Sequence, residues 1–325
     1  MTTLKIPGAD WRSELRSPLV LALVVLLGLQ LLLALGLNLG TPGITAVSPR
    51  TALLDFPREQ VVRMRIDSPD GGVTLKRVDE THWVIADLDD FPAAPSKVEQ
   101  LLDQLAALKR APPIATSEEA RRRFRLTDNG FERRLTLEGK DEPLATLLIG
   151  DSPGFRRVFA RPAADPSVYD LNLALSDLSS RRDDWLDPGL LRLDHNQITR
   201  IAAGDWVLIR EAETWRLDGT DRVVDQAAAN TLATRLAGLG YRGVLGTADL
   251  PAYRQQEPAL VLTIGLRDGN SRIYRISQAQ DSTDFVLKDK ARPYFFKLSS
   301  DDLDGLLNLS ADRLTAAPDA TENQP

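Results

Sequence analysis

The sequence predicts an α+β protein: an N-terminal transmembrane helix, then two tandem homologous units of antiparallel sheet with covering helices. Three observations support this fold class. Residues 19–37 form an uncharged apolar run, and the chain beyond them repeats itself once. Each copy also alternates apolar and polar residues with the period of a half-buried strand, before and after one helical stripe. Sheets of this kind bury one face under helices.

The run at residues 19–37, LVLALVVLLGLQLLLALGL, is apolar throughout except for Gln30. A helix needs about 20 apolar residues to cross a bilayer, so we expect a transmembrane helix over residues 18–39. A cleaved signal peptide is the alternative, but its apolar core would span only about 7–15 residues. Gln30 is either a tolerated polar residue or a contact with a membrane partner.

The charges around this run predict its orientation. Lys5, Arg12 and Arg16 precede it, whereas the first positive charge after it is Arg50. Positive residues favour the cytoplasmic side. We therefore expect residues 1–17 to form a cytoplasmic tail. The bulk of the chain would then lie outside the cytoplasm, held by a single pass through the membrane.

The rest of the chain contains an internal repeat. LLDFPREQVVRM, which begins at Leu53, matches LLRLDHNQITRI, which begins at Leu190, and Trp83 matches Trp215. Later matches stay in the same order while their offset shrinks, as a duplication followed by small deletions would produce. An aromatic residue that begins a strand in both copies indicates a core position.

These matches define the predicted domains. A tether at residues 40–52 leads into a first unit at residues 53–189 and a second at residues 190–314. A tether of this length spans at most about 50 Å, so the units stay near the bilayer. The small, polar residues 315–325 are expected to be disordered.

Both units are expected to contain the same order of elements: strands, a helix, more strands and a closing helix. The first unit is predicted to have strands near residues 62–66, 73–78, 82–86, 134–138, 144–149, 157–161 and 168–171, a helix capped by Ser96 and ending near Leu108, and helices at 118–125 and 173–185. The second is predicted to have strands near residues 206–210, 214–217, 260–266, 272–276, 285–288 and 294–298, a helix capped by Asp225 and ending at Leu239, and a closing helix at 301–309.

The composition excludes several kinds of function. The net charge of −6 argues against nucleic acid, which requires a basic face. The chain has no cysteine and only two histidines, His82 and His195, so thiol catalysis and histidine-rich metal sites are not expected. We predict no cofactor and no metal.

No catalytic motif stands out, and each candidate has a plainer explanation. The turn from Gly150 to Gly154 lacks the spacing of a hydrolase elbow or a phosphate loop. Adjacent carboxylates do not by themselves face each other as a glycosidase requires. Such adjacent pairs are Asp89–Asp90, Asp183–Asp184 and Asp301–Asp302.

One basic run remains as a candidate binding site. It consists of Arg121, Arg122, Arg123 and Arg125. The simpler interpretation is a solvated helix face. The functional alternative is contact with anionic lipid headgroups, because the predicted anchor holds the domain near a membrane.

Several stretches together resemble a known family. They are the LL-x-F opening from Leu53 with Gln60, Val61, Arg63 and Ile66, the Trp83 strand, the Val98–Leu108 stripe, the Gly150–Leu171 stretch and LSSRRDDWL at Leu178–Leu186. With them the chain, over about residues 50–310, resembles the bacterial domain-of-unknown-function family numbered 4340. The resemblance implies an envelope component beside ABC transporters of the gliding-motility type. It implies no activity and no site residues.

With this resemblance we expect a non-enzymatic accessory or scaffold protein, anchored by a single pass in the bacterial inner membrane with the bulk of the chain in the periplasm. Its partner would be an ABC transporter permease or a related envelope component. A lipid- or glycan-binding envelope module is the alternative, and an envelope hydrolase is the third.

Overall fold

The computed structural model describes residues 22–23, 25–32 and 51–315. Residues 22–23 and 25–32 are helical, and Gln30 is exposed there. Within the described residues, no helix is both long and apolar enough to cross a membrane. The predicted cytoplasmic tail, most of the predicted span, nearly all of the tether and the C-terminal tail beyond residue 315 lie outside the described residues.

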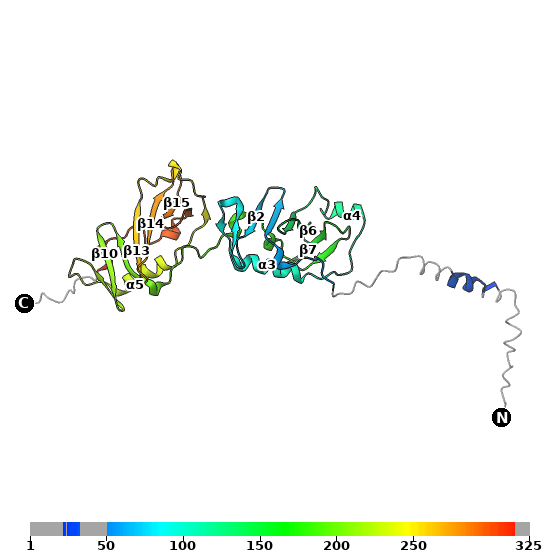
Figure 1. Cartoon of the computed structure of the whole chain (residues 1–325), viewed down its shortest axis with the longest axis horizontal. Coiled ribbons are helices and arrows are strands. Elements are labelled where there is room, and N and C mark those ends of the chain that lie inside the picture. The colour runs from blue at the N-terminus through cyan, green and yellow to red at the C-terminus, as the bar shows by residue number, and fades with distance from the viewer. Residues whose placement is uncertain (1–21, 24, 33–50, 316–325) are drawn as a thin grey trace, which may run out of the picture. The chain divides into compact units, whose positions relative to one another are not determined.

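The first repeat is built on an eight-stranded sheet (Figure 1). Its strands are β1 (Arg63–Ser68), β2 (Gly71–Arg77), β3 (Trp83–Ile85), β4 (Phe91–Pro92), β5 (Arg133–Glu138), β6 (Pro143–Ile149), β7 (Val158–Pro162) and β8 (Tyr169–Leu171). They lie in the order β4-β3-β2-β1-β5-β6-β7-β8, and every neighbouring pair is antiparallel. In β1, Met64 and Ile66 are buried whereas Arg63 and Arg65 are exposed, so the sheet buries one face.

Two helices follow β4 in the first repeat. Helix α3 (Pro95–Ala107) buries one stripe of side chains that includes Val98 and Leu105. The predicted cap at Ser96 is wrong, because Ala94 precedes the helix and Pro95 begins it with a backbone angle already suited to a first turn. Helix α4 (Glu118–Arg123) is capped by Ser117, whose hydroxyl accepts from the Ala120 amide at 3.2 Å.

The second repeat contains a second eight-stranded sheet. Its strands are β9 (Ile198–Ala203), β10 (Trp206–Glu211), β11 (Thr214–Leu217), β12 (Gly243–Val244), β13 (Leu260–Leu266), β14 (Ser271–Gln278), β15 (Phe285–Asp289) and β16 (Phe295–Leu298). They lie in the order β11-β10-β9-β13-β14-β15-β16-β12 and are also antiparallel throughout. Helix α5 (Gln226–Ala237) contacts β9 and β11.

The two sheets share the order of seven strands, because β1 lies between β2 and β5 as β9 lies between β10 and β13. They differ in one edge strand: β4 pairs with β3, whereas β12 pairs with β16 at the opposite edge. Asp225 caps α5 as predicted, accepting from the Ala227 amide at 2.9 Å, although the helix ends at Ala237, two residues before the predicted Leu239. The structure thus contains two tandem units of antiparallel sheet with few helices.

The two closing helices were predicted wrongly. Residues 173–185 contain only the 3-10 turns η3 (Leu175–Leu178) and η4 (Arg182–Trp185). The Ser179 hydroxyl accepts from the Arg181 amide at 3.2 Å, and such local bonds compete with a helix. In the second repeat, η7 (Asp301–Leu303) and η8 (Ala311–Leu314) are separated by Gly305, whose φ of 71° ends any helix.

The repeats meet through an aromatic cluster. Phe91, fully buried at the edge of the first sheet, packs edge-on against Tyr294 at 4.8 Å, Tyr241 at 6.1 Å and Phe296 at 6.2 Å between ring centroids. Edge-to-face pairs of this kind stabilise beyond the area they bury. Most buried apolar residues of both sheets accordingly form one continuous core cluster, and a second, small cluster of Leu126, Leu148 and Val168 lies apart from it.

Polar contacts surround this cluster. Asp89 accepts from both the amide and the hydroxyl of Thr247 at 2.9 Å, and the Tyr294 hydroxyl donates to the Asp90 carbonyl at 3.1 Å. Asp89 has a φ of 51°, a left-handed conformation that only a few residue types adopt readily. The Tyr241 hydroxyl also donates to the Asp187 carbonyl. Together these contacts join the two repeats into one compact unit.

Replacing Phe91 tests this junction. We expect Phe91→Ala to lower the free energy of unfolding by about 3–5 kcal/mol, because it leaves a cavity among three rings. Urea denaturation followed by circular dichroism measures the change. Phe155→Ala is the matched control, since that ring is 92% exposed and its loss should leave the midpoint unchanged. Equal midpoints for the two variants would contradict this role for Phe91.

Candidate functional site

The predicted basic run lies on α4 and just after it. Arg122 pairs with Glu118 at 2.9 Å, and Arg125 pairs with Glu132. Arg121 instead donates to the backbone carbonyls of Thr116 and Pro166. The structure therefore keeps the four arginines together at one end of the first sheet but engages most of them locally.

Arg123 differs from the other three. Its guanidinium lies 5.9 Å from the centre of the Phe124 ring, and it has no carboxylate partner among the described residues. The Arg122–Glu118 pair is itself well exposed, with side chains 64% and 68% accessible. Exposed pairs of this kind contribute little stability and can exchange for other anions. The run thus remains available for an anionic partner.

The β6–β7 hairpin lies directly against the end of α4. The Asp151 amide donates to the Phe124 carbonyl at 3.1 Å, and a Cβ at Gly150 would overlap that same oxygen. Phe124 and Phe159 pack with ring centroids 4.5 Å apart. Gly150 is therefore needed for the close approach of the hairpin base to the end of α4.

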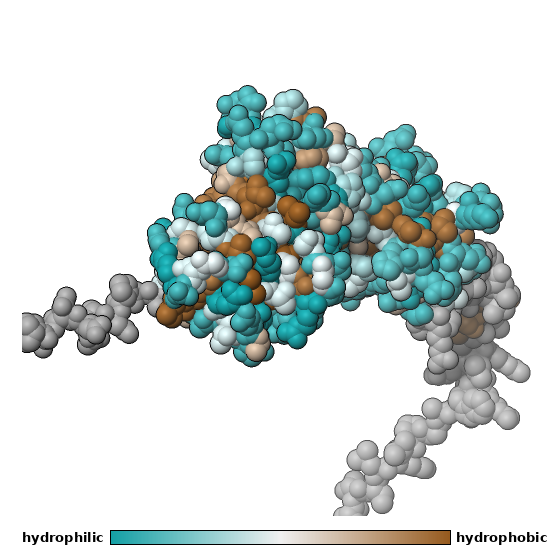
Figure 2. Space-filling view, turned by 60° about the vertical axis from the view of Figure 1, so that its left-hand side comes forward, coloured by the Kyte–Doolittle hydropathy of each residue, from teal (hydrophilic) through white to brown (hydrophobic). Residues whose placement is uncertain are grey.

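At the tip of this hairpin, Phe155 is almost fully exposed. The sequence pattern predicts only a turn here and does not single out Phe155. The signal was present, because an aromatic residue beside two arginines directly follows the turn glycine Gly154. Figure 2 shows that hydrophilic surface predominates on the face drawn and that hydrophobic side chains there form patches within it.

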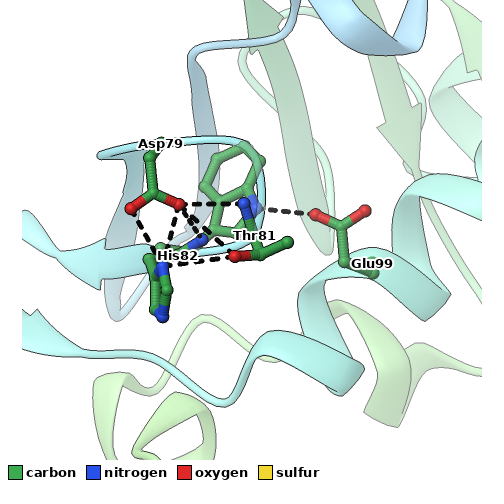
Figure 3. Close-up of polar contacts among 5 residues, drawn as sticks. Asp79, Thr81, His82 and Glu99 are labelled. Carbon is green, nitrogen blue, oxygen red and sulfur yellow. Dashed lines mark hydrogen bonds and ion pairs between the residues drawn. The ribbon is translucent and has the colours of Figure 1, made fainter.

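A second polar cluster surrounds Asp79 (Figure 3). Its carboxylate accepts from the amides of Thr81 and His82 at 3.0 Å and lies 2.8 Å from the Nδ1 atom of His82. The Thr81 amide, followed by the His82 side chain, lowers the pKa of Asp79 to about 2. A carboxylate this acidic is a poor general base near neutral pH. The cluster therefore braces the β2–β3 loop.

Each repeat holds its strand tryptophan in the same way. The indole Nε1 of Trp83 donates to Glu99 on α3 at 2.8 Å, and that of Trp215 donates to Asn230 on α5 at 3.0 Å. An arginine guanidinium also lies over each ring. Both tryptophans are buried, as predicted for core positions. Glu99 is thus a structural group that fixes the Trp83 indole.

The buried charges also have structural partners. Asp289 is fully buried and lies 3.4 Å from Arg292 and 3.8 Å from Arg272. Arg161 is 7% exposed and donates to the Leu126 carbonyl and to Asp128, both at 2.7 Å. Burying a charge is costly unless it is paired in this way.

The described part of the chain contains no group of three or more histidines and carboxylates that could hold a metal ion. A cavity of about 420 Å³ is lined by a single loop of the second repeat, residues 249–257. The adjacent carboxylates Asp301 and Asp302 border another hollow, where Asp302 is paired with Arg242 at 2.9 Å.

A family model described as Domain of unknown function (DUF4340) matches residues 83–258. The match begins at β3 of the first repeat and ends just before β13 of the second, so it crosses the junction between them. It is shorter than the resemblance found in the sequence. No curated protein and no solved structure matches the chain.

The hydrogen bonds around Asp79 in the β2–β3 loop predict a lowered pKa for its carboxyl group. We expect the Asp79 carboxyl to titrate at about 2 rather than 3.8, because hydrogen bonds favour its ionised form. Its stabilisation should be complete above pH 3.8 and disappear as the pH falls through 2. Carbon-detected NMR of the side-chain carboxyl measures the midpoint. A midpoint near 3.8 would show that the brace does not form.

The hydrogen bonds from the Trp83 and Trp215 indoles predict similar losses of stability in the two repeats when their acceptors are removed. We expect Glu99→Ala and Asn230→Ala each to lower the free energy of unfolding by about 1–3 kcal/mol, because a buried N–H group loses its acceptor. Chemical denaturation measures both. Glu99→Gln, which keeps a carbonyl acceptor, is the control and should retain most of the stability. If it fell as far as Glu99→Ala, the loss would not come from the missing acceptor.

Proposed function

Because the chain belongs to the DUF4340 family, we propose that it acts as an accessory or scaffold protein of the bacterial envelope rather than as an enzyme. Residues 19–37 would anchor it in the inner membrane, with the two repeats in the periplasm. Its partner would be an ABC-type transporter permease or another component of an envelope complex.

One observation carries this proposal: the conspicuous polar groups of the two repeats hold the fold together. Glu99 and Asn230 accept from equivalent indoles, Asp79 braces a loop and Asp89 joins the repeats. A duplicated body built in this way offers a large surface of fixed shape. That suits binding to other proteins better than it suits catalysis.

The anchor is the part of this proposal that is supported by sequence. The run of residues 19–37 is uncharged and has the length of a bilayer-crossing helix. Lys5, Arg12 and Arg16 before it favour a cytoplasmic N-terminus. A lipid- or glycan-binding module is the second candidate, favoured by the well-exposed side chains of Phe155 and Arg122.

Exchange of the anchor tests the proposal. Replacing residues 1–37 with a cleavable signal should release the repeats into the periplasm and abolish recovery of a membrane partner by affinity purification. The full chain, gently solubilised at native expression, should bring down a transporter component. A full chain that carries only Gln30→Leu is the control. Loss of the partner in this variant would indicate a contact made by Gln30 in the membrane, whereas unchanged recovery would indicate that the anchor only tethers the repeats.

Recovery of the full chain alone and as a monomer would contradict the accessory role. Equal recovery of the partner by the released repeats would show that the anchor is dispensable.

A further inference from the structure

The second sheet carries a mostly apolar row on its outer face, the face opposite the core. In the strand register, Val207, Ala202, Thr263 and Ile273 lie side by side across β10, β9, β13 and β14. All four side chains are half-buried, whereas residues that alternate with them, such as Leu262, are buried in the core. The solvated face of an antiparallel sheet normally carries polar residues, so this row needs an explanation.

The first repeat provides an internal comparison. Thr136 is the counterpart of Thr263, because each lies at the centre of matching strand sequences, LTL and LTI. The row through Thr136 runs across β2, β1, β5 and β6 and consists of Thr74, Arg65, Thr136 and Thr146. Every residue of this row is polar. The shared strand order therefore does not require apolar side chains at these positions.

Elsewhere the chain covers the apolar residues of its outer faces. On the first sheet, Leu148 packs with Leu126 and Val168 in the small cluster. On the second sheet, the side chain of Gln255 crosses β15 and donates to the Val286 carbonyl at 3.1 Å, and both residues are buried. An uncovered apolar row is thus an exception within this protein.

The row in the second sheet has no such cover. Val207 and Ile273 pack against neither core cluster of the described chain. The same holds for Ile209 and Val261, which lie on the same face because each is two residues along its strand from the row. Val261 is 39% exposed. These side chains together form a continuous apolar surface on β10, β13 and β14.

Two arginines flank these apolar side chains. Arg200 on β9 extends over Gly265 of β13, where a Cβ would lie 2.9 Å from the Arg200 Cβ and 3.8 Å from its Cγ and Cδ. Arg275 on β14 lies directly opposite Val261 in the register. Both arginines are exposed, and neither is paired with a carboxylate among the described residues. The surface therefore combines apolar area with two positive charges that lack a counter-ion.

We infer that this surface binds an amphipathic helix of a partner protein, whose apolar stripe is flanked by aspartate or glutamate. The surface, called the outer patch below, consists of Val207, Ile209, Val261, Ile273, Arg200 and Arg275. The stripe covers the apolar side chains, and the flanking carboxylates pair with the two arginines. The inference rests on the proposed function, which provides a protein partner for the repeats.

The charge and the shape of the outer patch favour a helix over two other occupants. A second copy of the same patch would add two more arginines and no carboxylate, and like charges across an interface disfavour binding. A bilayer surface would meet the exposed arginines before it reached the half-buried apolar side chains. A helix is narrow enough to lie between Arg200 and Arg275 and contact those side chains directly.

Photocross-linking in cells tests this inference with the full chain. A benzophenone amino acid is placed at Val261, and in a second chain at Val62 of the first repeat, a matched control because the two side chains are 39% and 36% exposed. We expect the probe at Val261 to cross-link another protein. Mass spectrometry should place the contact in a segment with apolar residues three and four apart and with acidic residues beside them. The probe at Val62 should give no such product.

Two variants and a control make the test specific. Val207→Thr with Ile273→Thr gives the second sheet the residue types of the first and should lower the cross-linking yield at least about tenfold, because apolar contact is lost. Arg200→Glu with Arg275→Glu should lower it by a similar factor through charge alone. Thr146→Ala, at the position equivalent to Ile273, should leave the yield unchanged. Unchanged melting temperatures would show that the variants fold.

Several results would overturn the inference. They are a product with lipid, a product with a second copy of this chain, a contact segment without acidic residues, and a yield that either double variant leaves unchanged. Affinity purification of the full chain separates this inference from the proposed function. A partner that is recovered there but does not cross-link at Val261 refutes only the outer patch, whereas recovery of the chain alone refutes the proposed function.

Discussion

The packing of Phe91 against the rings of the second repeat is the contact on which the rest of the structure depends. Each sheet buries one face, but the edge strand β4 of the first sheet would leave an aromatic ring in water without Tyr241, Tyr294 and Phe296. Asp89 and Thr247 then fix the relative position of the two surfaces through directional hydrogen bonds. The family match crosses the same junction, which fits a body whose functional unit is the pair of repeats.

Duplication explains both what the repeats share and where they differ. The buried indoles keep the same kind of acceptor on equivalent helices, because an unpaired buried N–H would destabilise either copy. The hairpin tips have no such constraint. In one copy Phe155 is followed by two arginines and in the other the tip carries Asp281 and Asp284, so the two tips differ in chemistry although they join equivalent strands.

Much of the fold could be predicted because alternation and helical stripes report burial directly. The alternation around Met64 and Ile66 predicted β1, and the capping residue Asp225 predicted the start of α5. Helices were wrongly predicted for the two closing segments. In the first, Leu178 and Trp185 are buried at a spacing that a helix would also allow. The serine and glycine residues of these segments instead favour turns. Asp89 was grouped with surface carboxylates, since its partner Thr247 lies in the other repeat and only tertiary structure brings them together.

The two repeats should behave as one rigid body, and the distance between them can be measured because the chain has no native cysteine. Spin labels on Val78→Cys and Val223→Cys replace exposed side chains, one in each repeat. Double electron–electron resonance then reports the distance between them. The account predicts a single narrow distance distribution that broadens when Phe91 is replaced by alanine. A distribution already broad in the otherwise unaltered chain would contradict it.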